Sequence, residues 1–248
     1  MDAPIVLTCG EACATILPDR GATVTRWMVK GKDIFYPETL SPVCGQLRRR
    51  GGMPLLFPQA GEGKGELVNH GFARSLPWQE REVCADRASF TLADTEATRA
   101  AYPFSFGLQA DIHLFEDALE YVLTVKNTGK VPLPTAPGLH PYLKITNRNK
   151  GRIETDIPGF SAGSFTGPHT LFFPWQKQAE IRMPDGGGVQ IAADKSFKRL
   201  SVWTEPGNDF ICFEPWRGEV GALQDPKQVL MVAPSKSLQL RLRLQNLV

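Results

Sequence analysis

Apolar and polar residues alternate along much of this chain. The alternation is strict over residues 238–245, where each leucine is followed by an arginine or a glutamine. Successive side chains of a β-strand point to opposite faces, so this pattern predicts a strand with buried leucines and exposed polar residues. It leaves open whether the strand lies inside a sheet or at its edge.

A second alternating region predicts a β-hairpin. Apolar residues occupy every second position in residues 108–114 and again in residues 119–125, and a short polar turn separates the two runs. One short helix is expected at residues 95–100, and the three glycines at 186–188 are few enough for a hairpin loop. Further strands are expected at residues 12–17, 23–29, 89–92, 189–193, 199–204 and 229–232.

Turn-forming residues are frequent, with 23 glycines and 20 prolines in 248 residues. No segment keeps a helical period for three turns. Many short strands separated by turns predict an all-β protein, and at this length a large antiparallel β-sandwich. The sequence contains no linker, internal repeat or low-complexity segment, so we expect residues 1–248 to form one domain.

The composition narrows the possible partners and the compartment. A formal net charge of +2 gives no overall positive field, so neither nucleic acid nor a membrane surface is an expected partner. The chain has no run of about 18 apolar residues and no basic leader before an apolar stretch, so neither a membrane span nor a signal peptide is expected. We expect a cytoplasmic protein, either a monomer or a homodimer.

The cysteines indicate reduced thiols. There are five, at irregular spacing and without a Cys-X-X-Cys pair, which argues against a disulfide framework or a zinc site. Cys9 and Cys13 are expected on one face of one strand, as buried thiols. No phosphate-binding loop, dinucleotide fingerprint or metal-ligand spacing occurs, so neither a metal nor a cofactor is expected.

Glu214 is the first candidate for chemistry. It lies near the end of the apolar run at residues 210–216 and is followed by Pro215, which disfavours helix at the residue before it. Partial burial between Phe213 and Trp216 would raise the pKa of the carboxyl and suit a general base near neutral pH. The alternative is a carboxylate that faces solvent at a strand end.

His140 is the second candidate. Pro137 and Pro141 hold the backbone around it extended, and a rigid backbone is useful where an imidazole must point at one atom. The alternative is a histidine whose hydrogen bonds are satisfied within a loop.

Residues 50–59 and 69–74 form a third group of candidates. Two adjacent glycines at 51–52 permit a positive φ or a close approach of the backbone. The side chains of Arg50, His70 and Arg74 could converge on hydroxyl groups or on an anion, or else they are solvated surface charge. The neighbours of Arg50, Arg48 and Arg49, are expected to be surface charge.

Taken together, these motifs resemble the aldose 1-epimerase (galactose mutarotase-like) family. The matching segments are residues 50–59, 69–74, 138–142 and 212–216, which occur in the order typical of that family. The resemblance extends over roughly residues 10–245 and implies a large antiparallel β-sandwich with a sugar cleft on one face. It also implies that Glu214 is the general base, that His140 is the general acid, and that His70 helps to hold the substrate oxygens.

The resemblance also bears on the substrate. Arg50 and Arg74 resemble arginines of the hexose-6-phosphate mutarotase branch, in which arginines bind the substrate. Family members often use a further acidic residue for sugar hydroxyls, and Asp209 and Asp194 are weak candidates for it. The implied reaction interconverts the α and β anomers of a hexose or a hexose 6-phosphate by acid–base ring opening, without a cofactor, and its partner is that small sugar.

Two other functions stay open on the sequence. A β-sandwich of this kind could be a non-catalytic carbohydrate-binding or sugar-sensing module, because a fold does not fix a function. A pure binder, however, has no need of both Glu214 and His140. A glycoside hydrolase usually needs two carboxylates across the scissile bond, and only one is well placed here.

Overall fold

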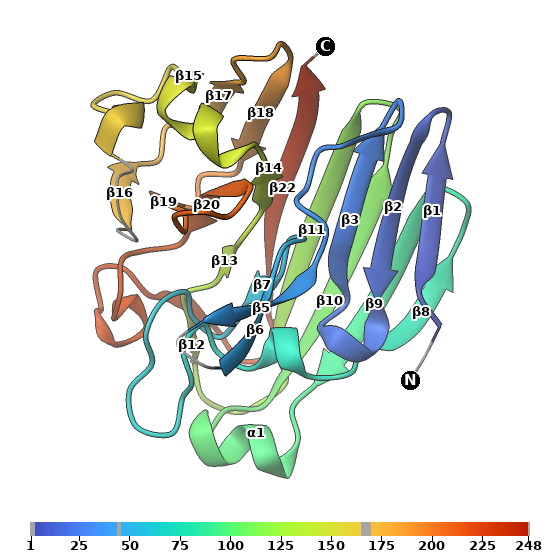
Figure 1. The fold of residues 1–248 in the computed structure, drawn as a ribbon. Coiled ribbons are helices and arrows are strands. Elements are labelled where there is room, and N and C mark those ends of the chain that lie inside the picture. The colour runs from blue at the N-terminus through green and yellow to red at the C-terminus, as the bar shows by residue number, and fades with distance from the viewer. Residues whose placement is uncertain (1–2, 44–45, 165–169, 248) are drawn as a thin grey trace.

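The computed structural model describes residues 3–43, 46–164 and 170–247, and antiparallel sheets dominate it (Figure 1). The all-β class and the large antiparallel β-sandwich expected from the sequence are both confirmed. Within the described ranges, no helix is both long and apolar enough to cross a membrane.

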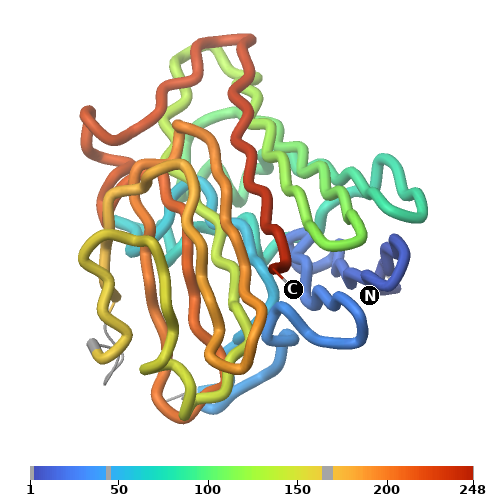
Figure 2. The backbone as a smooth tube through the Cα atoms, turned by 90° about the horizontal axis from the view of Figure 1, so that it is seen from above, coloured from blue at the N-terminus to red at the C-terminus, as the bar shows by residue number. Residues whose placement is uncertain are grey.

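The largest sheet has eight strands and forms one layer of the sandwich. Figure 2 shows its C-terminal strand, in red, between the green strands and the yellow and orange ones. In spatial order the strands are β15 (Glu154–Thr155), β17 (Gln178–Arg182), β18 (Gly188–Ala193), β22 (Ser237–Leu247), β11 (Ala118–Asn127), β10 (Phe106–Leu114), β9 (Arg87–Ala93) and β8 (Gln79–Val83).

Two further sheets face this layer. A four-stranded sheet lies over β8 to β11 in Figure 1, and a six-stranded sheet carries the residues discussed below. One continuous apolar core joins buried side chains from all three sheets. The four-stranded sheet is β1 (Ile5–Cys9), β2 (Ala12–Leu17), β3 (Thr23–Val29) and β4 (Lys32–Asp33); the six-stranded one is β16 (Leu171–Pro174), β19 (Arg199–Trp203), β20 (Phe210–Trp216), β13 (Gly138–Leu139) and β7 (Leu55–Leu56), with β14 (Tyr142–Lys144) also paired to β20.

Smaller elements connect these sheets. Two two-stranded pairs are β5 (Thr39–Val43) with β6 (Gln46–Arg50), and β12 (Leu133–Thr135) with β21 (Leu230–Val232). The α-helix is α1 (Glu96–Ala101), and short 3-10 turns are η1 (Pro18–Arg20), η2 (Ala73–Ser75), η3 (Asn147–Arg152), η4 (Ala162–Ser164) and η5 (Ala222–Gln224). The expected helix is therefore confirmed, and Thr95 caps it by accepting a hydrogen bond from the backbone N–H of Thr98.

The alternating segments form strands as predicted. The β10–β11 hairpin has Leu114 opposite Leu119. The strand at the C-terminal end, β22, lies inside the sheet between β11 and β18, which settles the question that its pattern left open. The glycine loop joins β17 to β18, and the expected strands at 12–17 and 23–29 have the predicted bounds.

The expectation for Cys9 and Cys13 is wrong. A turn at Gly10 and Glu11 places Cys9 at the end of β1 and Cys13 in β2, so the two thiols lie on different strands. Gly10 has a φ of +56°, which this two-residue turn requires. Both cysteines are half-buried free thiols, while Cys44 lies outside the described residues.

The central position of β22 leads to a prediction on stability. Leu242 has no exposed surface and lies opposite Tyr121 of β11, so Leu242→Ala should leave a cavity and lower the free energy of unfolding by about 2–5 kcal/mol. Leu238, half-buried at the start of the same strand, is the matched control and should lose less than half as much when changed to alanine. Urea unfolding measures both; equal losses would contradict the central role of β22.

Candidate active site

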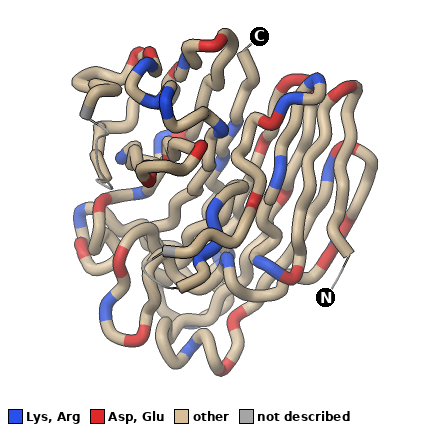
Figure 3. Tube along the Cα trace, in the orientation of Figure 1, with Lys and Arg blue, Asp and Glu red and all other residues tan. Residues whose placement is uncertain are grey.

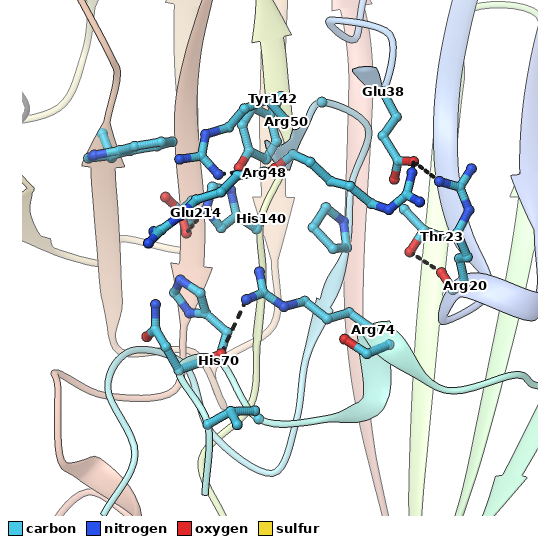
Figure 4. A pocket seen from close by; sticks show the side chains of 18 of the residues that line it. Arg20, Thr23, Glu38, Arg48, Arg50, His70, Arg74, His140, Tyr142 and Glu214 are labelled. Atoms are coloured by element: carbon cyan, nitrogen blue, oxygen red, sulfur yellow. Dashed lines mark hydrogen bonds and ion pairs between the residues drawn. The ribbon is translucent and has the colours of Figure 1, made fainter. Parts of the chain in front are cut away.

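A pocket of about 870 Å³ is lined by residues of the six-stranded sheet and of strand β6. Most of the polar candidates from the sequence line it, and Figure 4 shows them converging from several elements. Its lining comprises Arg20, Thr23, Glu38, Gln46, Arg48, Arg49, Arg50, Gly51, Pro54, Val68, Asn69, His70, Gly71, Arg74, Ser75, His140, Tyr142, Thr170, Ser201, Trp203, Glu214 and Trp216.

Strand pairing brings Glu214 and His140 together. On one side of Glu214, Trp216 of β20 pairs with Gly138 of β13; on the other side, Cys212 pairs with Tyr142 of β14. The short break between β13 and β14 therefore lies opposite Glu214, and His140 sits in that break. Its Nε2 atom is 3.4 Å from Oε2 of Glu214 (Figure 4).

Glu214 is almost completely buried, with 1% of its surface exposed. The indole Nε1–H of Trp216 donates a hydrogen bond of 3.0 Å to Oε2 of Glu214. Burial raises the pKa of Glu214 well above its ordinary value, and the Trp216 hydrogen bond and the charge of Arg74 only partly oppose this. The sequence analysis predicted a raised pKa for Glu214, although only partial burial of its carboxyl group was expected.

Two contacts hold His140 in place. Its backbone N–H donates to the carbonyl of Pro54 at 3.1 Å, and its ring stacks on Tyr142 with centroids 4.5 Å apart. Burial lowers the pKa of His140 well below its ordinary value, and the nearby His70 and Arg74 lower it further. Among the residues that the structure describes, the buried Nδ1 atom of His140 has no hydrogen-bond partner.

The environment thus favours the neutral forms of both side chains. A carboxylic acid beside a neutral imidazole carries one proton, as does a carboxylate beside an imidazolium. Two groups 3.4 Å apart that share a single proton can exchange acid and base roles during one reaction. This arrangement suits proton transfer at two neighbouring oxygens of a ligand.

His70 faces this pair from the other side of the pocket. Its backbone has a φ of +65°, an uncommon conformation for a residue other than glycine. The N–H of Gly61 donates to Nδ1 of His70 at 3.0 Å, so the neutral ring carries its proton on Nε2. Burial, together with Arg74 and Arg50, lowers the pKa of His70 to about 3, and His70 is therefore a neutral hydrogen-bond donor.

Arg50 is fixed by a residue that the sequence did not indicate. Its guanidinium donates from Nε to Oε2 of Glu205 at 3.1 Å and from Nη2 to Oε1 at 2.5 Å, a bidentate pair. The same group lies over the ring of Trp203, 5.3 Å from its centroid. The positive φ and close backbone approach that were expected at Gly51 and Gly52 are confirmed: a Cβ on Gly52 would lie 2.5 Å from the carbonyl oxygen of Val24.

Arg74 reaches the pocket from η2. Its Nη2 donates to the carbonyl of Asn69 at 3.2 Å, and burial lowers the pKa of the guanidinium. In Figure 4, Arg74 and His70 lie on one side of Glu214 and His140, and Arg48 and Arg50 lie on the other. The structure therefore brings five of the six candidate residues into one pocket.

Asp209 is the candidate that the structure does not bring there. It is exposed, and its carboxylate accepts a hydrogen bond of 2.7 Å from the backbone N–H of Asn147 at the start of η3. Asp194 is also outside the pocket lining, because it binds the backbone N–H of Arg241. Each of these carboxylates holds a loop in place.

Arg48 and Arg49 were expected to be surface charge, and both are exposed. Both also line the pocket, as residues of β6. Figure 3 shows Lys and Arg segments, in blue, gathered near the β5–β6 hairpin. The run of three arginines at 48–50 was the signal that the sequence offered. The composition alone does not show that β6 places these arginines at the pocket.

One group of described residues has the spacing of a metal site. Candidate ligand atoms of His140, Cys212 and Glu214 lie within 4.8 Å of one another, and all three residues are buried. Burial raises the pKa of the Cys212 thiol well above its ordinary value, which disfavours the thiolate that a metal would need. The described geometry fits acid–base chemistry by the histidine and the carboxylate better than metal binding.

Comparison with known proteins points to one family. The model of the family described as aldose 1-epimerase matches residues 4–161 of this chain. A protein of Salmonella typhimurium, named "Putative glucose-6-phosphate 1-epimerase", is 32% identical over 97 residues. That match covers 37% of this chain and 33% of the relative, so it spans about a third of the relative's length.

Solved structures share the whole fold. The Slr1438 protein from Synechocystis sp. PCC 6803 superposes with a TM-score of 0.88 at 28% identity, covering 100% of this chain and 96% of that one. A galactose mutarotase related enzyme from Lactobacillus acidophilus gives a TM-score of 0.83 at 19% identity, covering 99% and 98% of the two chains. At that identity the second likeness concerns the fold alone.

Proposed function

The chain belongs to the aldose 1-epimerase family, and from this premise we propose that it interconverts the α and β anomers of a hexose 6-phosphate. The observation that carries the proposal is the buried pair of Glu214 and His140, 3.4 Å apart, in a pocket lined by arginines. Anomer exchange needs one base and one acid at adjacent oxygens, and it needs no other reactive group.

In the proposed reaction, Glu214 takes the proton of the anomeric hydroxyl. His140 gives a proton to the ring oxygen while the bond between that oxygen and the anomeric carbon breaks. The products are the open-chain aldehyde, a carboxylic acid at Glu214 and a neutral imidazole at His140. Rotation about the first C–C bond presents the other face of the aldehyde, and closure returns both protons.

Burial supports this sequence of steps. The pKa of Glu214 is raised and that of His140 is lowered, so the site favours the neutral pair that accompanies the open-chain sugar. Burial therefore favours the products of ring opening relative to the ionised pair from which the step starts. The Nε2–H of His70 is available to donate to a substrate oxygen, because its Nδ1 is already bound to Gly61.

The charge of the pocket supports a phosphorylated substrate. Its lining contains five arginines, at positions 20, 48, 49, 50 and 74, against the carboxylates of Glu38 and Glu214. Binding of a neutral hexose does not require several cations, whereas a phosphate group binds guanidinium groups through paired hydrogen bonds.

Exchange spectroscopy tests the proposal. NMR would follow the exchange of α and β anomers of glucose 6-phosphate, glucose and galactose with the wild-type protein. We expect acceleration of the phosphorylated sugar well above that of the free sugars. Faster exchange of a free sugar would move the substrate to that class, and no acceleration of any sugar by folded protein would reject the activity.

A non-catalytic sugar-binding module is the second candidate. It accounts for the arginines and the aromatic side chains of the pocket, but it gives no reason for a carboxylate that is 1% exposed. Burying a carboxyl group costs free energy, and groups whose pKa values are shifted by burial gather at functional sites. Binding of glucose 6-phosphate in calorimetry without any anomer exchange would favour this alternative.

A further inference from the structure

Two unpaired polar atoms are buried in the wall of the pocket. Among the residues that the structure describes, six buried side-chain atoms have no hydrogen-bond partner. Two of the six belong to residues that line the pocket, namely Nδ1 of His140 and the hydroxyl oxygen of Ser201. Native proteins pair most of their buried polar groups, so each exception calls for an explanation. His140 belongs to the acid–base pair, whereas no step of the proposed reaction uses Ser201.

Ser201 lies beside Glu214 on the six-stranded sheet. Ser201 of β19 is directly opposite Glu214 of β20, so the two side chains point to the same face of the sheet. The neighbours of Ser201 in β19, Leu200 and Val202, point to the other face and pack in the main core. Trp203 shares the face of Ser201, and all three residues of this face, at 201, 203 and 214, line the pocket.

Glu214 is therefore flanked by the two unpaired groups. His140 lies in the break between β13 and β14 on one side of β20, and Ser201 lies on β19 on the other side. Oε2 of Glu214 accepts the hydrogen bond from Trp216 and is the oxygen next to Nε2 of His140. Oε1 accepts no hydrogen bond from the described residues. The carboxyl thus has a free acceptor, and the hydroxyl of Ser201 is a free donor.

The register brings this donor within reach of the carboxyl. The Cβ atoms of directly opposite residues are about 4.5–5.5 Å apart, close enough for their side chains to interact. No hydrogen bond joins Ser201 to Glu214 in the described structure, in which burial favours the neutral carboxyl. A change between the staggered rotamers of Ser201 moves its hydroxyl without moving the backbone. Ser201 has no exposed surface, so its hydroxyl is better placed for Glu214 than for a bound sugar.

The other groups around Glu214 leave a role for such a donor. The charge of Arg74, from η2, and the hydrogen bond from Trp216 both favour the carboxylate, but burial outweighs them. Cys212 of β20 and Tyr142 of β14 also act on Glu214, and burial raises the pKa of the thiol and of the phenol, which keeps both neutral. The reaction starts from ionised Glu214, so a further donor to its carboxylate increases the share of molecules that can react.

We propose that Ser201 is a positioning residue for the base: its hydroxyl turns and donates a hydrogen bond to the carboxylate of Glu214 when that group is ionised. This inference rests on the proposed function and deepens it, because it adds a third member to the acid–base pair. The proton of the hydroxyl stays on Ser201 throughout. The step that Ser201 assists is the transfer of a proton from the anomeric hydroxyl to Glu214.

The test compares Ser201→Ala with Tyr121→Phe. Each variant removes a buried hydroxyl that lacks a partner, but Tyr121 lies on β11, outside the pocket lining. Neither change leaves another group unpaired, so neither should lower the melting temperature. Ser201→Ala should lower kcat for glucose 6-phosphate about threefold to tenfold, because the carboxylate keeps part of its charge in the transition state. KM should stay nearly unchanged.

Two further variants complete the comparison. Tyr121→Phe should keep the turnover of the wild type, because its hydroxyl is remote from Glu214. Ser201→Thr keeps a hydroxyl at the same position and should retain most of the turnover that Ser201→Ala loses.

Carbon-13 NMR of the Glu214 carboxyl gives a readout that does not depend on turnover, and the signal missing from Glu214→Gln identifies it. Loss of the donor should raise the pKa of Glu214 in Ser201→Ala and leave it unchanged in Tyr121→Phe. No rise of this pKa, or a higher KM with an unchanged kcat, would overturn the proposal. Failure of anomer exchange with every sugar, while the pKa still rises in Ser201→Ala, would reject the enzymatic function and leave the bond between Ser201 and Glu214 standing.

Discussion

The Glu214→Gln variant should turn over about a hundredfold to ten-thousandfold more slowly than the wild type, with KM nearly unchanged. Glutamine has the shape of glutamate, and its amide oxygen can still accept the hydrogen bond from Nε1 of Trp216. The amide cannot take a proton from the anomeric hydroxyl. The loss should therefore fall on the chemical step and not on binding.

NMR exchange between the anomers of glucose 6-phosphate measures this loss, and Glu219→Gln is the matched control. Glu219 pairs with Arg199 near the surface and lies outside the pocket lining, so its replacement should leave turnover unchanged. Near-wild-type turnover in Glu214→Gln would show that another group is the base.

The Glu214→Gln variant should be at least as stable as the wild type, although it is less active. Burial raises the pKa of Glu214 in the folded protein above its value in the unfolded chain. The stability from this group is present below the unfolded pKa and is lost as the pH rises through the folded pKa. Glutamine does not ionise, so the Glu214→Gln variant does not lose this stability at neutral pH. Its melting temperature should therefore equal or exceed that of the wild type.

Strands with alternating apolar and polar residues were predictable from the sequence. The strand that carries Glu214, β20, was harder to interpret. Residues 238–245 have one buried and one exposed face, so their pattern reads directly as a strand. By contrast, all seven residues of β20 are buried, and a continuous apolar run does not reveal which side chain faces a cavity. Glu214 was identified because a charged residue interrupts that run.

Partners of the site residues were the least predictable part. Glu205 binds Arg50 across 155 positions of sequence, and only the folded structure brings the two together. Arg48 was expected to be surface charge and is exposed, and only the folded structure shows that it also lines the pocket. Asp209 has the right chemistry but lies at the wrong end of β20, where it holds η3.

Replacing His140 by glutamine should also lower turnover about a hundredfold to ten-thousandfold, and it should change the pH dependence. In the wild type, burial raises the pKa of Glu214 and lowers that of His140, so the pair keeps one proton over a wide range around neutrality. Turnover should therefore vary little with pH there.

In His140→Gln, Glu214 works alone and must be ionised to act as a base. Residual turnover should then rise as the pH rises through the elevated pKa of Glu214, a slope that the wild type lacks. His113→Gln is the control, because His113 lies on β10, outside the pocket lining, near Asp86. A residual activity that stays flat with pH, or a loss below about tenfold, would mean that Glu214 does not depend on His140 for its proton, and that the acid is a different group of the pocket.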